Sequence, residues 1–445
     1  MMTPRRRVSA ATLLLLLSAT SATALSPCGG TGVGWCLSKR FAGDVAGGEL
    51  GFRFGEPLDV DGDGRADVGA GSRFKLRSRT LQNGSASVWS GTTGAKIREW
   101  DGILPDGLFG HWVLPVADID GDALADVVIS SPNGRLAGMA SGLVAARSPK
   151  SGAEIWRRMG TGDENFGWDL AVTDDVDRDG KREILVGAPA GKAGHVYLLN
   201  GKNGALLRTY TPTTPTATFG WFVAGLGDLD GDGRGELAVG AQFEADAKGV
   251  VVGGAYVLSG ATGKEIHHWM GADAFGDFGE VVAGVGDLDG DGLGEVAIGS
   301  SRTNDQSRSR PGEVWVRSGK SGNVIHHWTG TQAGELYGRM IAAIGDLDGD
   351  GVEDLAIGSP WHGRGPATRV GRVEFRTGKT GAVLGELFGD EADGWFGWHI
   401  RRAPDPEGRG RPALLVGSLR HSAGGDDDAG VIDLIVLRRE GDAGR

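Results

Sequence analysis

The sequence lacks the features that mark several common protein classes. Basic residues do not predominate, since 46 Lys and Arg stand against 58 Asp and Glu and the net charge is −12. This balance argues against a nucleic-acid-binding protein, which normally carries a basic patch. After the first 24 residues no apolar run is long enough to span a membrane, and no helical periodicity is present. Glycine is abundant, at 81 of 445 residues, but follows no Gly-X-Y period, which excludes collagen.

The N-terminus has the three parts of a secretory signal. Three arginines at 5–7 precede a short apolar run that includes residues 13–17, and Ala22-Thr23-Ala24 forms a small-residue cleavage site. A membrane anchor is the alternative, but it needs about 20 apolar residues. We therefore predict a signal peptide over 1–24 and a secreted protein, extracellular or periplasmic, without membrane insertion.

Only two cysteines are present, Cys28 and Cys36, and both follow the predicted cleavage site. In an exported chain we expect them to form a disulfide, because oxidising compartments preserve such bonds. Two free thiols are the alternative. The segment 25–36 is therefore expected to be an N-terminal extension that is tied down by this pair.

The rest of the chain is a repeat. A short acidic motif begins seven times, at intervals of 53 to 59 residues: at Asp59, Asp118, Asp175, Asp228, Asp287, Asp346 and Asp405. Eight residues before each of these stands a glycine: Gly51, Gly110, Gly167, Gly220, Gly279, Gly338 and Gly397. The residue before the glycine is Leu50 in the first unit and aromatic in the others. Such a period indicates a repeat architecture.

Each unit predicts four short strands. In the fifth unit these are about 281–285, 295–299, 313–317 and 324–328, bounded by Gly, Asp, Asn or Ser. Four strands per unit, repeated seven times, predict an all-β, seven-bladed β-propeller of four-stranded antiparallel blades. The last unit supplies only one strand after Gly430, so we expect the strand near 36–41 to complete the seventh blade. The predicted propeller covers 37–437 and leaves a C-terminal tail at 438–445.

Six units carry carboxylates at positions 1, 3, 5 and 9 of a nine-residue loop. They are Asp59, Asp61, Asp63 and Asp67; Asp118, Asp120, Asp122 and Asp126; Asp175, Asp177, Asp179 and Glu183; Asp228, Asp230, Asp232 and Glu236; Asp287, Asp289, Asp291 and Glu295; and Asp346, Asp348, Asp350 and Asp354. A further oxygen can come from the position-7 backbone carbonyl, which belongs to Arg65, Leu124, Lys181, Arg234, Leu293 or Val352. A tight turn points alternate carboxylates at one centre, and hard oxygen ligands suit Ca²⁺. We predict up to six bound Ca²⁺ ions.

Two other interpretations of the loops are weaker. Solvated acidic turns do not explain one spacing that recurs six times, because crowded carboxylates repel one another by roughly 4 kcal/mol per pair at 4 Å. An EF-hand needs a Glu at position 12, where these loops have Ala, Ile or Val. Ala123 replaces the position-6 glycine of the second loop, so that site is expected to be weaker. The seventh loop has Arg409 and Ala413 at positions 5 and 9, so we expect it to be ion-free and Asp405→Ala to be nearly neutral.

The aromatic-Gly start, the Asp-x-Asp-x-Asp-Gly-x-x-Asp/Glu loop and segments such as Gly187-Ala188-Pro189 resemble FG-GAP repeats, as in the N-terminal propeller of integrin α-subunits. The resemblance covers almost the whole chain after the predicted signal peptide. It implies a seven-bladed propeller with Ca²⁺ in hairpin loops on one face. It also implies a non-enzymatic extracellular module for adhesion or ligand binding, with a protein or glycan as its partner.

No catalytic constellation stands apart from the repeat. The adjacent histidines at 267–268 and 326–327 recur at the repeat spacing, which favours a structural role over metal binding. Most tryptophans also follow the repeat, whereas Trp361 and Trp395 do not and are the candidates for a ligand-binding face. A carbohydrate-binding, lectin-like propeller and a calcium-dependent enzyme acting on polysaccharides remain as alternatives.

Overall fold

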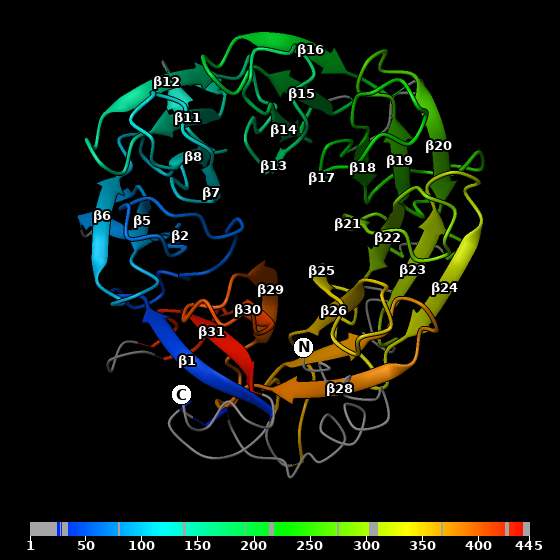
Figure 1. Ribbon diagram of the computed structural model, residues 1–445. Helices are drawn as coiled ribbons and strands as arrows, with labels where there is room; N and C mark the ends of the chain where they lie inside the picture. The colour runs from blue at the N-terminus through cyan, green and yellow to red at the C-terminus, as the bar shows by residue number, and fades with distance from the viewer. Residues whose placement is uncertain are drawn as a thin grey trace, which may run out of the picture.

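The computed structural model describes residues 25, 26, 28, 34–78, 81–136, 139–191, 193–212, 218–273, 276–301, 310–365, 368–422 and 427–438. These residues form seven antiparallel sheets around a central axis, the β-propeller predicted from the repeat (Figure 1). The described part of the chain contains no helix, and so none that could cross a membrane. The predicted signal peptide at 1–24 and the tail after residue 438 lie outside the described residues.

Successive blades follow the chain, each running from the axis to the rim. The first comprises β2 (Val68–Ser72), β5 (Ser85–Trp89) and β6 (Lys96–Asp101). The second comprises β7 (Val113–Val116), β8 (Asp126–Ser131), β11 (Leu143–Arg147) and β12 (Glu154–Met159), and the third β13 (Asp169–Val172), β14 (Ile184–Ala188), β15 (His195–Leu199) and β16 (Leu206–Tyr210). The fourth comprises β17 (Phe222–Gly225), β18 (Leu237–Ala241), β19 (Gly254–Leu258) and β20 (Glu265–Met270). The fifth comprises β21 (Val281–Val285), β22 (Glu295–Ser300), β23 (Glu313–Ser318) and β24 (Val324–Thr329).

The sixth blade comprises β25 (Met340–Gly345), β26 (Asp354–Ser359), β27 (Arg372–Arg376) and β28 (Val383–Phe388). The seventh comprises β29 (Phe396–Ala403), β30 (Ala413–Ser418), β31 (Val431–Arg438) and β1 (Gly34–Ala42). Two small ribbons extend from the first two blades: β3 (Leu76–Ser78) with β4 (Leu81–Gln82), and β9 (Arg135–Leu136) with β10 (Met139–Ala140).

The ring closes as predicted, because the N-terminal strand β1 pairs with β31 in antiparallel register from Gly34↔Arg438 to Ala42↔Val431. Cys28 and Cys36 form a disulfide, and Arg438 donates a hydrogen bond to the Cys28 carbonyl at 2.8 Å. Trp35 stacks on Phe375 of the sixth blade, with ring centroids 4.9 Å apart. The N-terminal segment therefore ties the sixth and seventh blades together at the closure.

The first blade departs from the four-strand pattern within the described residues. Where its innermost strand would lie, only Leu58 forms a bridge, to Asp67. Pro57 has no N–H to contribute to a ladder, and the Gly55 N–H is donated to Val113 of the second blade at 3.0 Å. This segment is therefore shared between two blades and does not form a regular strand.

The two faces of the ring differ in what they carry. From the second blade on, each innermost strand lies between an aromatic-Gly turn and the repeated loop. The turns therefore lie on one face of the ring, the turn face, and the loops on the other, the loop face. The aromatic residues of the turns are buried between blades. The glycine is required there: at Gly110, with φ of 82°, a Cβ atom would lie 2.1 Å from the Ser85 carbonyl oxygen.

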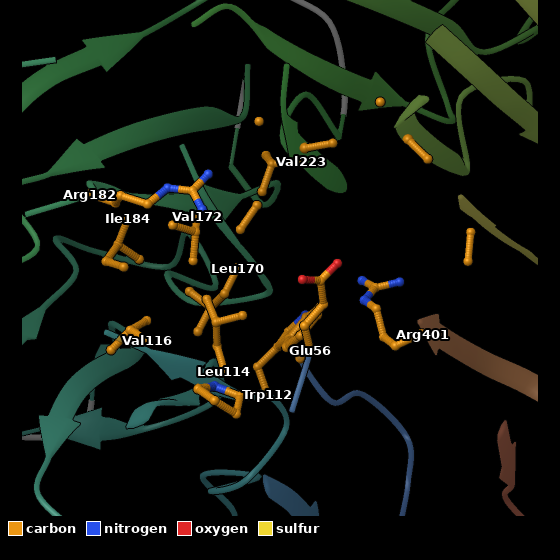
Figure 2. Close-up of a pocket in the computed structure, with 18 of the residues that line it drawn as sticks. Glu56, Trp112, Leu114, Val116, Leu170, Val172, Arg182, Ile184, Val223 and Arg401 are labelled. Carbon is orange, nitrogen blue, oxygen red and sulfur yellow. The ribbon is translucent and has the colours of Figure 1, made fainter. Parts of the chain in front are cut away.

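Neighbouring blades are also joined at the rim. His267 Nε2 lies 2.8 Å from the Gly319 oxygen of the next blade, and His326 Nε2 lies 2.6 Å from Gly378 O. Each of these imidazole rings also stacks on the tryptophan two residues later in the chain. His267 and His326 are therefore inter-blade contacts, whereas His268 and His327 stack on Tyr256 and Trp315 of their own blades. Both arrangements agree with the structural role predicted for the repeated histidines. Along the axis, the innermost strands surround a cavity of about 430 Å³ (Figure 2).

Candidate functional site

The acidic loops share one backbone conformation, shown here by the fifth loop between β21 and β22. The position-1 carboxylate of Asp287 accepts the N–H of the position-6 glycine, Gly292, at 2.9 Å. Asp289 accepts the N–H of Asp291 at 3.1 Å, and Asp291 accepts that of Leu293 at 3.0 Å. These bonds curl the loop so that its carboxylates converge.

The position-9 carboxylate comes from the next strand and reaches under the loop. Glu295 is 1 % exposed, and its Oε2 accepts the Leu288 N–H at 2.9 Å. Its Oε1 has no hydrogen-bond partner, and the same holds for one buried oxygen of Asp126 and one of Glu236. A buried carboxylate oxygen without a partner is unfavourable unless a cation or a proton satisfies it.

Burial raises the pKa of all six position-9 carboxyl groups. The pKa rises to about 6 for Asp67 and Asp126, to about 7 for Glu183, Glu236 and Asp354, and to about 8 for Glu295. The neighbouring aspartates of each loop add to this rise, because like charges oppose ionisation. Without a cation, ionisation of the position-9 carboxyl group is therefore unfavourable in each loop.

The predicted ligands come together to different extents. In the fourth and fifth loops all four carboxylates offer oxygens within 4.8 Å of one another. In the first three loops the groups that meet this distance are Asp59, Asp61 and Asp67; Asp118, Asp120 and Asp122; and Asp175, Asp177 and Glu183. The N–H groups of the position-7 residues are donated to the position-5 aspartates at 2.8 to 3.0 Å.

The donor set suits Ca²⁺. Every side-chain ligand in the six loops is a carboxylate, and a divalent ion bound there would satisfy the unpartnered position-9 oxygens. Zn²⁺ would require His or Cys ligands, which none of these loops contains. The residues therefore fit the ion that the sequence predicts.

The turn face carries an arc of aromatic rings in contact with one another. It contains the two predicted ligand-face residues, Trp361 and Trp395, whose centroids are 5.6 Å apart. The arc runs in order through Trp361, Trp395, Trp398, Phe52, His111, Trp168, Trp221 and Phe243, with successive centroids 4.7 to 6.1 Å apart. Five of the eight rings follow a motif glycine directly, so the repeat itself contributes most of the arc.

Comparison with known proteins identifies the type of repeat. Residues 175–239 match a model described as an FG-GAP-like repeat, and residues 340–373 match one described as an FG-GAP repeat. The chain is a β-propeller that contains FG-GAP repeats. FG-GAP repeats therefore account for the aromatic-Gly turns and the acidic loops.

Several larger proteins share this FG-GAP region. The chain is 30 % identical to integrin alpha-5 of Xenopus laevis over 214 residues, which are 44 % of this chain and 20 % of that protein. It is 28 % identical to integrin alpha-V of Gallus gallus over 213 residues, with 44 % and 20 % covered. Phosphatidylinositol-glycan-specific phospholipase D of Rattus norvegicus is 30 % identical over 237 residues, with 47 % and 27 % covered. The matched regions are thus minor parts of these relatives.

Among solved structures, one chain in the crystal structure of BBS1N in complex with ARL6DN has a similar fold. The TM-score is 0.52 at 10 % identity, and the match covers 91 % of this chain and 98 % of the other. At that identity the likeness concerns the fold alone.

Two FG-GAP loops depart from the common glycine pattern. Ala123 occupies position 6 of the second loop at φ of 72°, the left-handed region that glycine adopts without strain. Its N–H is still donated to Asp118, at 3.1 Å, so the loop keeps its shape. In the third loop Arg178 replaces the position-4 glycine at φ of 64°, a departure that the sequence analysis missed although the glycine pattern would have revealed it.

Asn200 is a second feature missed from the sequence. Its side-chain amide donates to Asp177 at 2.7 Å and to Asp179 at 2.8 Å, from the turn between β15 and β16. The other five calcium-loop repeats have Ser or Thr at this place, so the exception was visible in the pattern. The amide attracts two of the four predicted ligands of the third loop.

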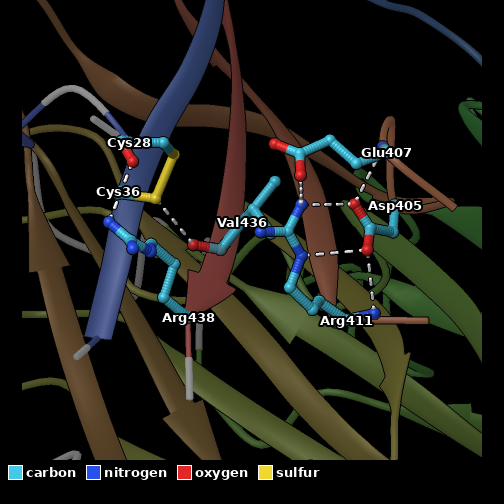
Figure 3. The surroundings of a disulfide bond; sticks show 7 residues. All are labelled: Cys28, Cys36, Asp405, Glu407, Arg411, Val436 and Arg438. Carbon is cyan, nitrogen blue, oxygen red and sulfur yellow. Dashed lines mark hydrogen bonds and ion pairs between the residues drawn. A yellow bond between two sulfur atoms is a disulfide. The ribbon is translucent and has the colours of Figure 1, made fainter. Parts of the chain in front are cut away.

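The seventh FG-GAP loop contains a side-chain cation (Figure 3). Arg411 donates two hydrogen bonds to Asp405, at 2.9 and 2.8 Å, and both residues are buried. Desolvation opposes ionisation of Asp405, but the arginine outweighs it and lowers the pKa of Asp405 to about 2. This pairing argues against the expectation that Asp405→Ala is nearly neutral, because the substitution removes the two shortest side-chain bonds of a buried guanidinium and leaves it only Glu407, 3.3 Å away. Arg409, the arginine noted in the sequence, pairs with Glu407 at 2.9 Å.

Proposed function

We propose that this protein is a secreted, calcium-binding propeller that acts as a non-enzymatic extracellular module for adhesion or ligand binding. The observation that carries the proposal is the buried position-9 carboxylate of the FG-GAP loops, with an unpartnered oxygen in three of them. Up to six Ca²⁺ ions would neutralise these oxygens and stiffen the loop face. The turn face is then free to meet a partner.

Secretion is supported by the sequence of residues 1–24 and by the Cys28–Cys36 disulfide. Disulfides persist in oxidising compartments, and extracellular calcium is present at millimolar levels that suit modules of low affinity. The localisation that we propose is extracellular or periplasmic.

The partner is an extracellular protein or a glycan, and the aromatic arc supports the turn face as its binding surface. Stacked, partly exposed tryptophans offer apolar ring faces at one surface, on which the apolar face of a sugar can stack. This feature favours a glycan, so a lectin-like propeller is the second candidate. An enzyme acting on polysaccharides is the third.

A binding screen tests the proposal. Protein comprising residues 25–445 would be applied to a glycan array and to a panel of extracellular matrix proteins, in calcium and in chelator. We expect calcium-dependent binding that Trp395→Ala abolishes. Ile103→Ala is the matched control, since Ile103 is 56 % exposed and lies in a turn-face loop outside the arc. Binding unaffected by Trp395→Ala would exclude the arc, and polysaccharide turnover by the pure protein would refute a non-enzymatic role.

A further inference from the structure

The axial cavity has the construction of a small-molecule site. Its volume of about 430 Å³ lies within the range of about 300 to 1,000 Å³ that is typical of ligand pockets. Its wall is mostly apolar and comes from the innermost strands of the second to sixth blades, with Leu114, Val172 and Ile341 as examples. Strand ends beside the acidic loops also line it, so the cavity extends to the loop face.

Toward the turn face, a group of buried side chains crosses the axis. Arg53 from the first blade forms an ion pair with Asp169 of the third at 2.9 Å and lies over the Phe222 ring of the fourth at 4.4 Å. Trp112 donates to the same aspartate at 2.6 Å. Each of these four side chains is at most 4 % exposed, so they fill the axis at this level. The cavity is therefore a blind pocket that opens on the loop face.

Arg401 projects into this pocket beside Glu56, whose carboxylate faces it without forming an ion pair (Figure 2). Its guanidinium donates to its neighbour's carbonyl, Ile400 O, at 3.0 Å and lies 5.6 Å from the centre of the Trp112 ring. It forms no ion pair with any carboxylate among the described residues, whereas Arg53 nearby is paired. Burial lowers the pKa of Arg401, and the charges of Glu56 and Asp169 offset this effect only in part. An unpaired guanidinium in an apolar pocket is a ready partner for an anion.

All but one of the other charged residues that line the pocket are cationic, like Arg401. Lys181, Arg182 and Arg402 line it together with Arg401, and Glu56 is the one acidic residue in its lining. Figure 2 shows the Glu56 carboxylate projecting into the same space. The excess of cations selects an anionic ligand, and the planar guanidinium favours one that accepts two hydrogen bonds.

We propose that the axial pocket binds a small carboxylate with an apolar body, whose carboxylate group pairs with Arg401 and whose body lies against the strand walls. This site adjoins the second and third acidic loops at its mouth, but it uses none of their carboxylates and is separate from the aromatic arc. It does not depend on the function proposed above. The pocket volume suits a medium-length aliphatic or aromatic acid.

Isothermal titration calorimetry with octanoate in calcium tests the proposal. We expect saturable binding that tightens about fourfold for each methylene from butanoate to octanoate, because each buried methylene has a similar hydrophobic gain. Octylamine, 2-aminooctanoate and acetate should bind more weakly than octanoate. Tighter binding of octylamine or 2-aminooctanoate would overturn the assignment of the ligand's charge.

Two variants locate the site. Arg401→Gln should weaken octanoate binding about tenfold or more, the usual effect of losing a charge-assisted hydrogen bond. Ala343→Phe places a ring into the pocket wall and should abolish binding without touching Arg401. Arg409→Gln, in the seventh loop, is the control and should bind like the unmodified protein. Unchanged binding by both pocket variants, or no binding to the unmodified protein at millimolar octanoate, would overturn the proposal.

Discussion

Glu295→Gln should change stability in opposite directions with and without calcium. The side chain is 1 % exposed, one of its oxygens has no partner, and burial raises its pKa to about 8. Without metal the carboxylate is therefore unfavourable in the folded chain. Glutamine has the same shape and keeps an acceptor for the Leu288 N–H, but it carries no charge. With calcium the carboxylate becomes a ligand that glutamine replaces poorly.

The magnitudes follow from linkage. The folded chain binds the Glu295 proton more tightly than the unfolded chain, whose pKa is about 4.5. Its contribution to stability is therefore complete below pH 4.5 and is lost as the pH rises through about 8. At pH 8 this loss is at most about 4 kcal/mol, which Glu295→Gln would recover in chelator. In calcium at about 100 times the dissociation constant, losing one site costs about 2.7 kcal/mol. For a chain of this size these values correspond to about 1 °C in Tm per kcal/mol.

Differential scanning calorimetry at pH 8 measures both effects. We expect Glu295→Gln to raise Tm by up to about 4 °C in chelator and to lower it by about 3 °C in calcium. Glu265→Gln, at an exposed carboxylate on β20, is the control and should change neither value. Shifts of the same sign in both conditions, or no shift in calcium, would refute the assignment of Glu295 as a ligand. In chelator, Tm of the unmodified protein should also fall between pH 5 and pH 8, and the calcium-induced increase should grow.

Three further substitutions test other parts of the ring. Asp405→Ala should cost about 3 kcal/mol of unfolding free energy in calcium and in chelator alike, because it removes the closest partner of the buried Arg411 and leaves only the half-exposed Glu407; chemical denaturation measures it. Ala123→Gly should stabilise the chain by about 1 kcal/mol by removing left-handed strain, seen as a higher denaturation midpoint. Cys28→Ser should cost about 2.5 kcal/mol by opening the short loop closed with Cys36, and a reductant should lower Tm of the unmodified protein only.

Each of these predictions has a contrary outcome. A loss at Asp405→Ala that appears only in calcium would place an ion in the seventh loop. An Ala123→Gly variant that is less stable than the parent would mean that the left-handed turn costs nothing at that position. A Cys28→Ser variant with unchanged stability would show that pairing of β1 with β31 alone holds the closure.

Local features of this protein could be determined from the sequence by itself. The period, the strand order and the closure by β1 all followed from motifs that recur along the chain, and the computed fold has each of them. The acidic loops are local features too. A nine-residue turn is shaped by its own glycines and by hydrogen bonds between its own residues, as at Asp287 and Gly292. Such geometry needs no information from other blades.

Contacts between distant parts of the chain were decided only by the tertiary structure. Closing the ring brings Arg401 of the seventh blade beside Trp112 of the second. It also leaves the Arg401 guanidinium without an ion pair, in a cavity that no sequence motif predicts. The same closure joins rings from six blades into one aromatic arc. Within the seventh loop, burial selected Arg411 and not Arg409 as the partner of Asp405. These outcomes depend on how blades pack against one another and on which groups lose water, and residue spacing specifies neither.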